Sequence, residues 1–291
     1  MTEQILPEIW ISASLRREID ALAKTCASVE DAESVALAHN ISAPLHTNPE
    51  WVIFDSAVTT SILERGYVVV RGLSVDGGRS LLIVSTVLGP AFDTYIPGKI
   101  VKRFRMSPWT EELSHTTREG EFHTDANVAT TPPIATAIQC EVEDPGAPAY
   151  GEQRVAYLPD LLEQLASVPH YTSGLSLLTQ PESNMAHERS SGSWRGALVD
   201  KGQIRYHPHS LRVSSKRLGG QETDLEVAIA AVHQASLDAS IPFHTQPGDT
   251  LLVSNRTALH YRGECSVRFT KFPMEYESRS VLVINVHDRA R

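Results

Sequence analysis

Cysteines, long apolar runs and positive charge are all scarce in this sequence of 291 residues. Cys26, Cys140 and Cys265 are odd in number and widely spaced, without a C-x-x-C pair, so neither a disulfide framework nor a thiolate zinc site is predicted. No segment reaches the roughly 18 apolar residues of a transmembrane helix, and the N-terminal stretch MTEQILPEIWIS lacks a basic region and a long apolar run. We therefore expect a soluble, cytoplasmic protein.

The shortage of positive charge also limits the kinds of partner that the protein is expected to bind. The chain has 26 Lys and Arg against 35 Asp and Glu, which gives a formal net charge of -9. This balance disfavours a general binder of nucleic acid or of anionic membranes. A hydrophobic content of 41% and a charged content of 21% are ordinary for a globular protein. We expect a single domain over 1–291 that acts on a small molecule, and a carrier protein or a homo-oligomer stays open.

The N-terminal part of the chain has the apolar spacing of helices. Apolar residues recur every three or four positions over 14–26, and a second helical stretch covers 49–65. The β-branched residues of 67–72 then indicate a buried strand. The pattern predicts a mostly helical N-terminal cover over 1–66 and a β-rich core over 67–291.

The rest of the chain alternates short strands with polar loops, which favours a mainly β, double-sheet fold with flanking helices, best fitted by a jelly roll. Two polar stretches near 107–122 and 180–195 are expected to be lid loops over a site. Predicted strands lie at 99–106, 134–142, 174–179, 196–199, 203–206, 251–253 and 280–286, and helices at 80–88, from Pro159, and from a Thr223–Glu226 capping box that turns Leu225, Ile229 and Val232 inward.

A possible metal site begins at His123 and Asp125, two residues apart just before the strand at 134–142. On extended backbone both side chains would point to the same face, so an imidazole and a carboxylate could converge. The best candidate for a third ligand is His260, in GDTLLVSNRTALHYR. Two imidazoles and one carboxylate on one face of a metal leave positions open for a co-substrate and dioxygen, which suits Fe(II). Asn255 is expected to orient this turn or a neighbouring ligand.

These motifs resemble the Fe(II)/2-oxoglutarate-dependent dioxygenases of the taurine dioxygenase (TauD/TfdA) and clavaminate synthase-like superfamily. The stretches LERGYVVVRGL, FHTDANVATTPP and GDTLLVSNRTALHYR, with a basic residue at the head of the last strand, carry the resemblance over about 63–286. It implies a double-stranded β-helix (jelly-roll) core, with Fe(II) bound by His123, Asp125 and His260. It also implies that 2-oxoglutarate and O2 are co-substrates, that succinate and CO2 are released, and that a C–H bond is hydroxylated.

The resemblance also names residues for 2-oxoglutarate. Arg279 would pair with its distal carboxylate, because a guanidinium grips a carboxylate through two parallel hydrogen bonds. Arg268 is a rival, but Arg279 is preferred because it opens an apolar strand as the family's arginine does. Gln153 stands where the family carries a threonine that touches 2-oxoglutarate, so it is a further candidate.

The substrate is expected to be a small polar metabolite, an amino acid or an amino-acid-derived natural product. Whether the product is hydroxylated, desaturated or cyclised stays open. Trp109 and Trp194 in the polar loops, and Arg103 and Arg205 on strands, are candidate substrate contacts, although loop anchoring or solvent exposure would explain them as well. The segment Tyr206–His209 is expected to be a loop without metal ligands, since it carries a proline and lacks a neighbouring carboxylate.

Two alternatives belong to other classes of protein. A zinc-dependent hydrolase could use the same His/Asp/His ligands with an activated water; it would need a nearby general base and would not need Arg279. A non-enzymatic β-fold binding protein would give the His-x-Asp pair no role.

Overall fold

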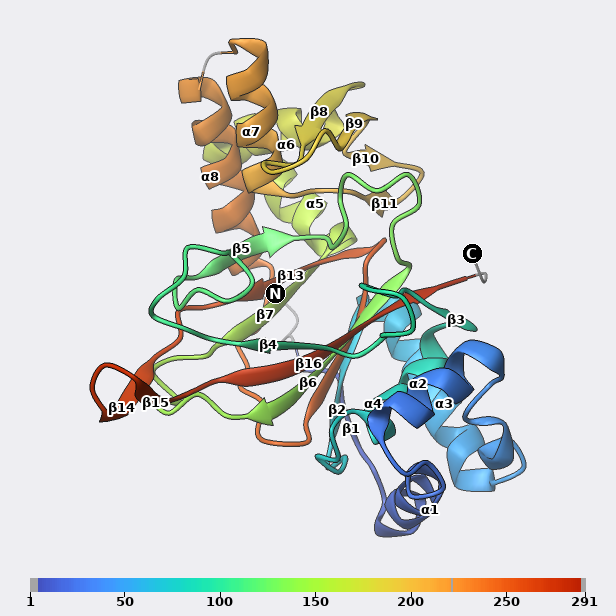
Figure 1. The fold of residues 1–291 in the computed structure, drawn as a ribbon. Coiled ribbons are helices and arrows are strands. Elements are labelled where there is room, and N and C mark those ends of the chain that lie inside the picture. The colour runs from blue at the N-terminus through green and yellow to red at the C-terminus, as the bar shows by residue number, and fades with distance from the viewer. Residues whose placement is uncertain (1–4, 221, 289–291) are drawn as a thin grey trace.

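The computed structural model describes residues 5–220 and 222–288. Two β-sheets face each other, and helices cover the outer side of each sheet, so the chain forms four layers (Figure 1). The N-terminal helices lie against the larger sheet and the later helices against the smaller one.

The first helical layer covers the larger sheet. Its α3 begins after Asn48, whose side chain accepts from the amide of Glu50, and it ends at Gly66, which adopts a left-handed φ of 76°. The layer consists of α1 (Ala13–Ala23), α2 (Val29–Ala38), α3 (Pro49–Arg65) and α4 (Arg79–Ser85), with short 3-10 turns at Ala43–Leu45 and Thr86–Leu88.

The larger sheet has the order β1-β2-β12-β6-β16-β3, with β4 also paired to β16, and β1 and β2 are its one parallel pair among the described residues. Side chains alternate across each strand, so Val68 and Val70 pack on the helices while Val69 faces the smaller sheet. The strands are β1 (Glu8–Trp10), β2 (Tyr67–Arg71), β3 (Ala91–Phe92), β4 (Lys102–Arg105), β6 (Ala135–Val142), β12 (Thr250–Ser254) and β16 (Ser280–His287).

The smaller sheet is antiparallel, with the order β5-β13-β7. Its strands are β5 (Gly120–His123), β7 (Gln153–Tyr157) and β13 (Ala258–Arg262). The helices on its outer side are α5 (Leu158–Ser167), α6 (Thr172–Thr179), α7 (Pro208–Leu218) and α8 (Glu222–Asp238), with a 3-10 turn at Pro169–Tyr171. Three hairpins project from this frame: β8 (Ser183–Ala186) with β9 (Ser193–Gly196), β10 (Val199–Asp200) with β11 (Gln203–Ile204), and β14 (Val267–Lys271) with β15 (Glu275–Ser278).

The strongly patterned elements are confirmed. The helices predicted over 14–26 and 49–65 are α1 and α3, and the strands predicted over 67–72, 134–142 and 280–286 are β2, β6 and β16. Helix α5 follows the prediction from Pro159, and Ile229 and Val232 of α8 are buried as expected.

Several predictions around the second helical layer are wrong. Residues 174–179 form α6 instead of a strand, because Gly174 allows α6 to approach α8 closely: a Cβ there would lie 3.0 Å from the backbone nitrogen of Val232. Helix α8 begins at Glu222, so Thr223 lies inside its first turn and is not its N-cap. Residues 180–195 contain the β8–β9 hairpin rather than an open loop.

The proportion of helix to strand also differs from the expectation. Helices occupy more of the described residues than strands do, so the chain is mixed α/β rather than mainly β. Helices α2 and α7 have no counterpart among the predicted elements. Within residues 5–220 and 222–288, no helix combines the length and the apolar character needed to cross a membrane.

Gly248, in the turn that leads into β12, packs so closely on the backbone of Leu73 that it leaves no room for a side chain. It adopts a φ of 94°, and a Cβ at this position would overlap the carbonyl oxygen of Leu73. We expect Gly248→Ala to lower the free energy of unfolding by about 3 kcal/mol or more, since it adds a backbone collision to the strain of a left-handed alanine. Gly98→Ala is the matched control, because Gly98 has a φ of 78° but no atom within 4 Å of the added Cβ. That control should cost only about 1 kcal/mol by urea denaturation, and equal losses for the two variants would contradict the packing at Leu73.

Candidate metal centre

Two histidines converge through strand pairing in the smaller sheet. In the antiparallel pair of β5 and β13, His123 is the direct cross-strand partner of His260. Side chains opposite each other in such a pair point to the same face of the sheet. The two ring centroids therefore lie 4.3 Å apart, at an interplanar angle of 59°.

The side chain of Asp125 also points toward the two imidazoles, but it does so from a turn and not from the extended strand that was predicted. Strand β5 ends at His123, and Asp125 lies in the turn that follows, so the two residues do not share one extended strand. Ala126 continues this turn with a left-handed φ of 50°, which is uncommon for a residue with a side chain. Asn255 holds the turn in place: its Oδ1 accepts from the Asp125 amide at 2.7 Å, and its Nδ2 donates to the carbonyls of Asp125 at 3.1 Å and Pro133 at 3.0 Å.

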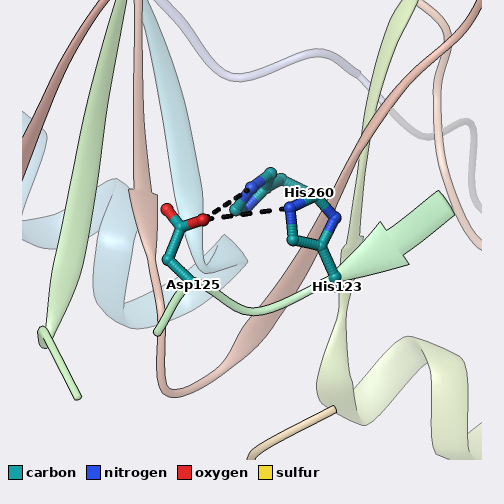
Figure 2. Close-up of side chains that lie close together, drawn as sticks. All are labelled: His123, Asp125 and His260. Atoms are coloured by element: carbon teal, nitrogen blue, oxygen red, sulfur yellow. Dashed lines mark ion pairs between the residues drawn. The ribbon is translucent and has the colours of Figure 1, made fainter. Parts of the chain in front are cut away.

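The three side chains turn their ligand atoms toward one another (Figure 2). Asp125 Oδ1 lies 3.8 Å from Nε2 of His123 and 3.8 Å from Nε2 of His260, while its Oδ2 accepts a hydrogen bond from Thr136 Oγ1 at 2.7 Å. His123 Nδ1 donates to the carbonyl of Glu121 at 2.6 Å. Because a carbonyl can only accept, the proton of neutral His123 sits on Nδ1, and the lone pair of Nε2 faces Asp125.

Burial keeps the second imidazole ready to bind a metal. Burial, reinforced by the neighbouring His123, lowers the pKa of His260 to about 4, although Asp125 acts in the opposite direction. The imidazole is therefore neutral near neutral pH, as metal binding requires.

These observations fit a divalent metal ion. One ligand atom from each of His123, Asp125 and His260 lies within 4.8 Å of the other two, and they form the one His/Cys/Asp/Glu group of this kind among the described residues. Two nitrogens and one carboxylate oxygen are the donor set that non-haem Fe(II) sites use, with positions left open for other molecules.

A cavity of about 290 Å³ opens at the three ligands, between the two sheets. A second cavity of about 250 Å³ shares Phe104, Asp125, Ala126 and Val283 with it. The walls of the larger cavity combine apolar side chains with a few charged and polar ones: Phe104, Met106, Leu113, Ile138, Pro208, Leu251, Val281 and Val283 on the apolar side, and Ser114, Glu119, Glu121, Asn127, Gln153, His207, Arg262 and Arg279 on the polar side.

Arg279 lies in this cavity as a buried cation without a partner. Its side chain is 3% exposed, and its guanidinium makes no hydrogen bond or ion pair with a described residue. Burial lowers the pKa of Arg279 below its ordinary value. An unpaired buried charge is costly, so the position is suited to an anionic ligand that enters the cavity.

Arg268, the rival candidate for binding 2-oxoglutarate, does not line this cavity. Arg268 lies on β14, has a side chain that is 67% exposed, and forms an ion pair with Glu277. Gln153 does line the cavity, with its Nε2 donating to Thr245 Oγ1 at 2.7 Å.

The four predicted substrate contacts lie outside the lining of this cavity. Trp109 is 59% exposed and packs on Phe269 of the β14–β15 hairpin at a centroid distance of 6.0 Å. Arg103 pairs with Glu141 at 2.7 Å, and Arg205 stacks on Trp194 at 4.9 Å. Of the two predicted lid loops, 107–122 contributes to the lining and 180–195 does not.

The residue that sequence reasoning missed is His207. It was expected in a loop, but it caps α7, lines the cavity and lies with its ring 5.2 Å from that of His123. Burial lowers its pKa to about 3. The available signal was local: a histidine directly before a proline can be the N-cap of a helix whose first residue is that proline.

Comparisons with known proteins agree with this arrangement. The model of the taurine catabolism dioxygenase TauD, TfdA family matches residues 37–268. The fold is similar to that of asparagine oxygenase in complex with Fe(II), 2S,3S-3-hydroxyasparagine and succinate, with a TM-score of 0.71 and 17% identity over 97% of this chain and 93% of that chain. It is also similar to the non-heme iron oxygenase OrfP in complex with Fe and alpha-ketoglutaric acid, with a TM-score of 0.69 and 16% identity over 98% of this chain and 95% of that one. No curated protein sequence matches the chain.

The hydrogen bond from Thr136 to Asp125 predicts a measurable effect on metal affinity. We expect Thr136→Val to weaken Fe(II) binding about tenfold, because Asp125 loses the contact that fixes its second oxygen. Thr136→Ser keeps a hydroxyl at the same position and should bind Fe(II) almost as the unchanged protein does. Anaerobic Fe(II) titration of both variants makes the comparison, and equal affinities would show that this hydrogen bond does not orient the carboxylate.

Proposed function

The chain belongs to the TauD/TfdA family of taurine catabolism dioxygenases, and from this premise we propose that it is an Fe(II)- and 2-oxoglutarate-dependent oxygenase. Its reaction is the hydroxylation of an unactivated C–H bond in a small polar metabolite, with release of succinate and CO2. The metabolite is an amino acid or an amino-acid-derived natural product.

The unpaired guanidinium of Arg279 is the single observation that carries this proposal. It lines the same cavity as His123, Asp125 and His260, so one small dianion could meet both the metal and the arginine. A carboxylate on Arg279 would receive two parallel hydrogen bonds and would relieve the cost of a buried charge. A zinc hydrolase or a plain binding protein gives this arginine no such partner.

The residues of the chain have separate roles in this function. His123, Asp125 and His260 would hold Fe(II), and the iron, when bound with 2-oxoglutarate, supplies the activation of O2 that a C–H hydroxylation needs. Thr136 and Asn255 hold Asp125 in position through its carboxylate and its backbone. Ile138, Leu251 and Val281 keep water away from the reacting groups.

The geometry of the sheets supports two further points of the proposal. We infer that the two facing sheets form a distorted double-stranded β-helix (jelly-roll) core, with the ligands of the metal on strands and a turn at the mouth of the fold. We also infer that 1–291 form a single oxygenase domain in which α1–α4 cover the core.

The choice of an amino-acid substrate rests on the structural relatives and on the size of the cavity. One structural relative is asparagine oxygenase in complex with Fe(II), 2S,3S-3-hydroxyasparagine and succinate, so that complex contains both a hydroxylated amino acid and succinate. A cavity of about 290 Å³ suits a co-substrate and a small metabolite rather than a polymer.

The function is tested by an anaerobic titration of the metal-free protein with Fe(II) and then 2-oxoglutarate. We expect a visible charge-transfer band from the chelated keto acid in the unchanged protein, and no band in His260→Ala. Arg279→Met should raise the 2-oxoglutarate concentration needed for the band by about 100-fold, since truncating one side of a buried charge pair costs about 3 kcal/mol. Arg268→Met, which removes an exposed arginine, should leave the titration unchanged.

Arg279→Met is not expected to unfold the protein, because the guanidinium has no partner among the described residues. A thermal melt of the ligand-free variant checks this. If the folded, iron-loaded protein gives no band with 2-oxoglutarate, the co-substrate assignment is wrong.

A further inference from the structure

His207 is held against the metal centre by backbone contacts. The amide of Thr124, the residue between two of the ligands, donates to the carbonyl of Tyr206 at 2.8 Å, and the amide of Tyr206 donates back to Thr124 Oγ1 at 3.1 Å. The next residue, His207, therefore stands beside His123, with the two rings 5.2 Å apart and inclined at 71°. Its place at the cavity wall is set by the fold rather than by a free loop.

Hydrogen bonding determines which nitrogen of His207 carries the proton. His207 is the N-cap of α7, and its Nδ1 accepts from the backbone amide of Ser210 at 3.3 Å. An amide N–H can only donate, so Nδ1 presents a lone pair and the proton of the neutral ring sits on Nε2. This Nε2–H has no hydrogen-bond partner among the described residues, although the ring lines the cavity.

Two other charged side chains that line the cavity, Glu121 and Arg262, already have hydrogen-bond partners. Glu121 accepts from Arg212 through both of its oxygens, at 2.8 Å each. Arg262 donates to the carbonyls of Leu113 and Arg118. Arg279 has the role proposed above, and the Nε2–H of His207 is a donor at the cavity wall without a partner in the described part of the chain. His207 is half-buried and its ring lines the cavity, so a ligand in the cavity that carries a hydrogen-bond acceptor could receive this donor.

We propose that His207 is a substrate-binding residue whose Nε2–H donates a hydrogen bond to an oxygen of the substrate, a carboxylate or a carboxamide oxygen of an amino acid or its amide. This inference rests on the proposed function. It defines the substrate as a molecule that presents an oxygen acceptor beside the C–H bond to be oxidised. The helix cap and the substrate contact use opposite nitrogens of one ring.

Two substitutions separate these two roles. In His207→Asn the side-chain oxygen can occupy the place of Nδ1 and keep the cap of α7, but the cavity donor is lost. In His207→Gln the side-chain amide can reach the place of Nε2 and keep the donor, but the cap is lost. A purely structural histidine and a substrate-binding histidine therefore predict opposite orders for the two variants.

The experiment uses the protein loaded anaerobically with Fe(II) and 2-oxoglutarate. The probes are the twenty L-amino acids and their carboxyl amides, and the readout is the perturbation of the charge-transfer band when a probe binds near the iron. For the probes that bind, we expect His207→Asn to weaken binding about tenfold or more, the loss of one hydrogen bond. His207→Gln should stay within about threefold of the unchanged protein, and its melting temperature should be the lower of the two.

Any result other than weaker probe binding in His207→Asn with near-normal binding in His207→Gln contradicts the inference. If His207→Asn binds the probes normally, or if probe affinity follows melting temperature, His207 only caps α7. If the band forms but none of the probes perturbs it, the substrate class is wrong and the inference falls while the co-substrate assignment stands. If the band itself does not form, the proposed function fails and the inference fails with it. Comparing each binding acid with its amide identifies which kind of oxygen His207 receives.

Discussion

The pairing of His260 with His123 across β5 and β13 is the constraint on which the rest of the site depends. A shift of one residue in this register would send one imidazole to the opposite face of the sheet, where the α5–α8 layer packs. The register in turn relies on the burial of both faces of the smaller sheet, one against the helices and one against the larger sheet. The hydrophobic layers therefore position the ligands, although they supply none of the three ligand side chains.

Asp125 is not positioned by strand pairing, because it lies in a turn and not in a strand. Its position comes from a turn with a left-handed Ala126 and from the hydrogen bonds of Asn255, which arrives from the turn between β12 and β13. Asn255 thus joins the turn after the first ligand to the strand that carries the last one. Such a turn stores local strain, and it persists because the surrounding hydrogen bonds determine its shape.

The convergence of His123, Asp125 and His260 could be predicted from the sequence, but not the path by which these residues meet. Elements with strong periodicity, such as α3 and β16, were predictable because their apolar faces are set by burial alone. Helix α6 was not, because its short segment has the alternation of a strand and becomes a helix only where Gly174 packs on α8. The exclusion of Trp109, Trp194 and Arg205 from the cavity lining follows from loop and hairpin geometry, which no local pattern encodes. Arg103 of β4 is excluded for another reason: it alternates along the chain with Phe104 and Met106, which line the cavity.

Arg279 and His207 show two ways in which a fold tolerates polar groups beside a reactive centre. Arg279 is an unpaired charge, and its burial is unfavourable until an anion arrives. Its backbone is held between β15 and β16, where its carbonyl accepts from the Met106 amide at 2.9 Å. His207 makes a contribution of its own, since one nitrogen caps a helix while the other stays free for a ligand. The capping bond also fixes the tautomer, so the contact that stabilises α7 makes the other nitrogen of the ring a hydrogen-bond donor. In the native chain a single ring therefore serves both the stability of α7 and the recognition of the substrate on that wall, through two different nitrogens.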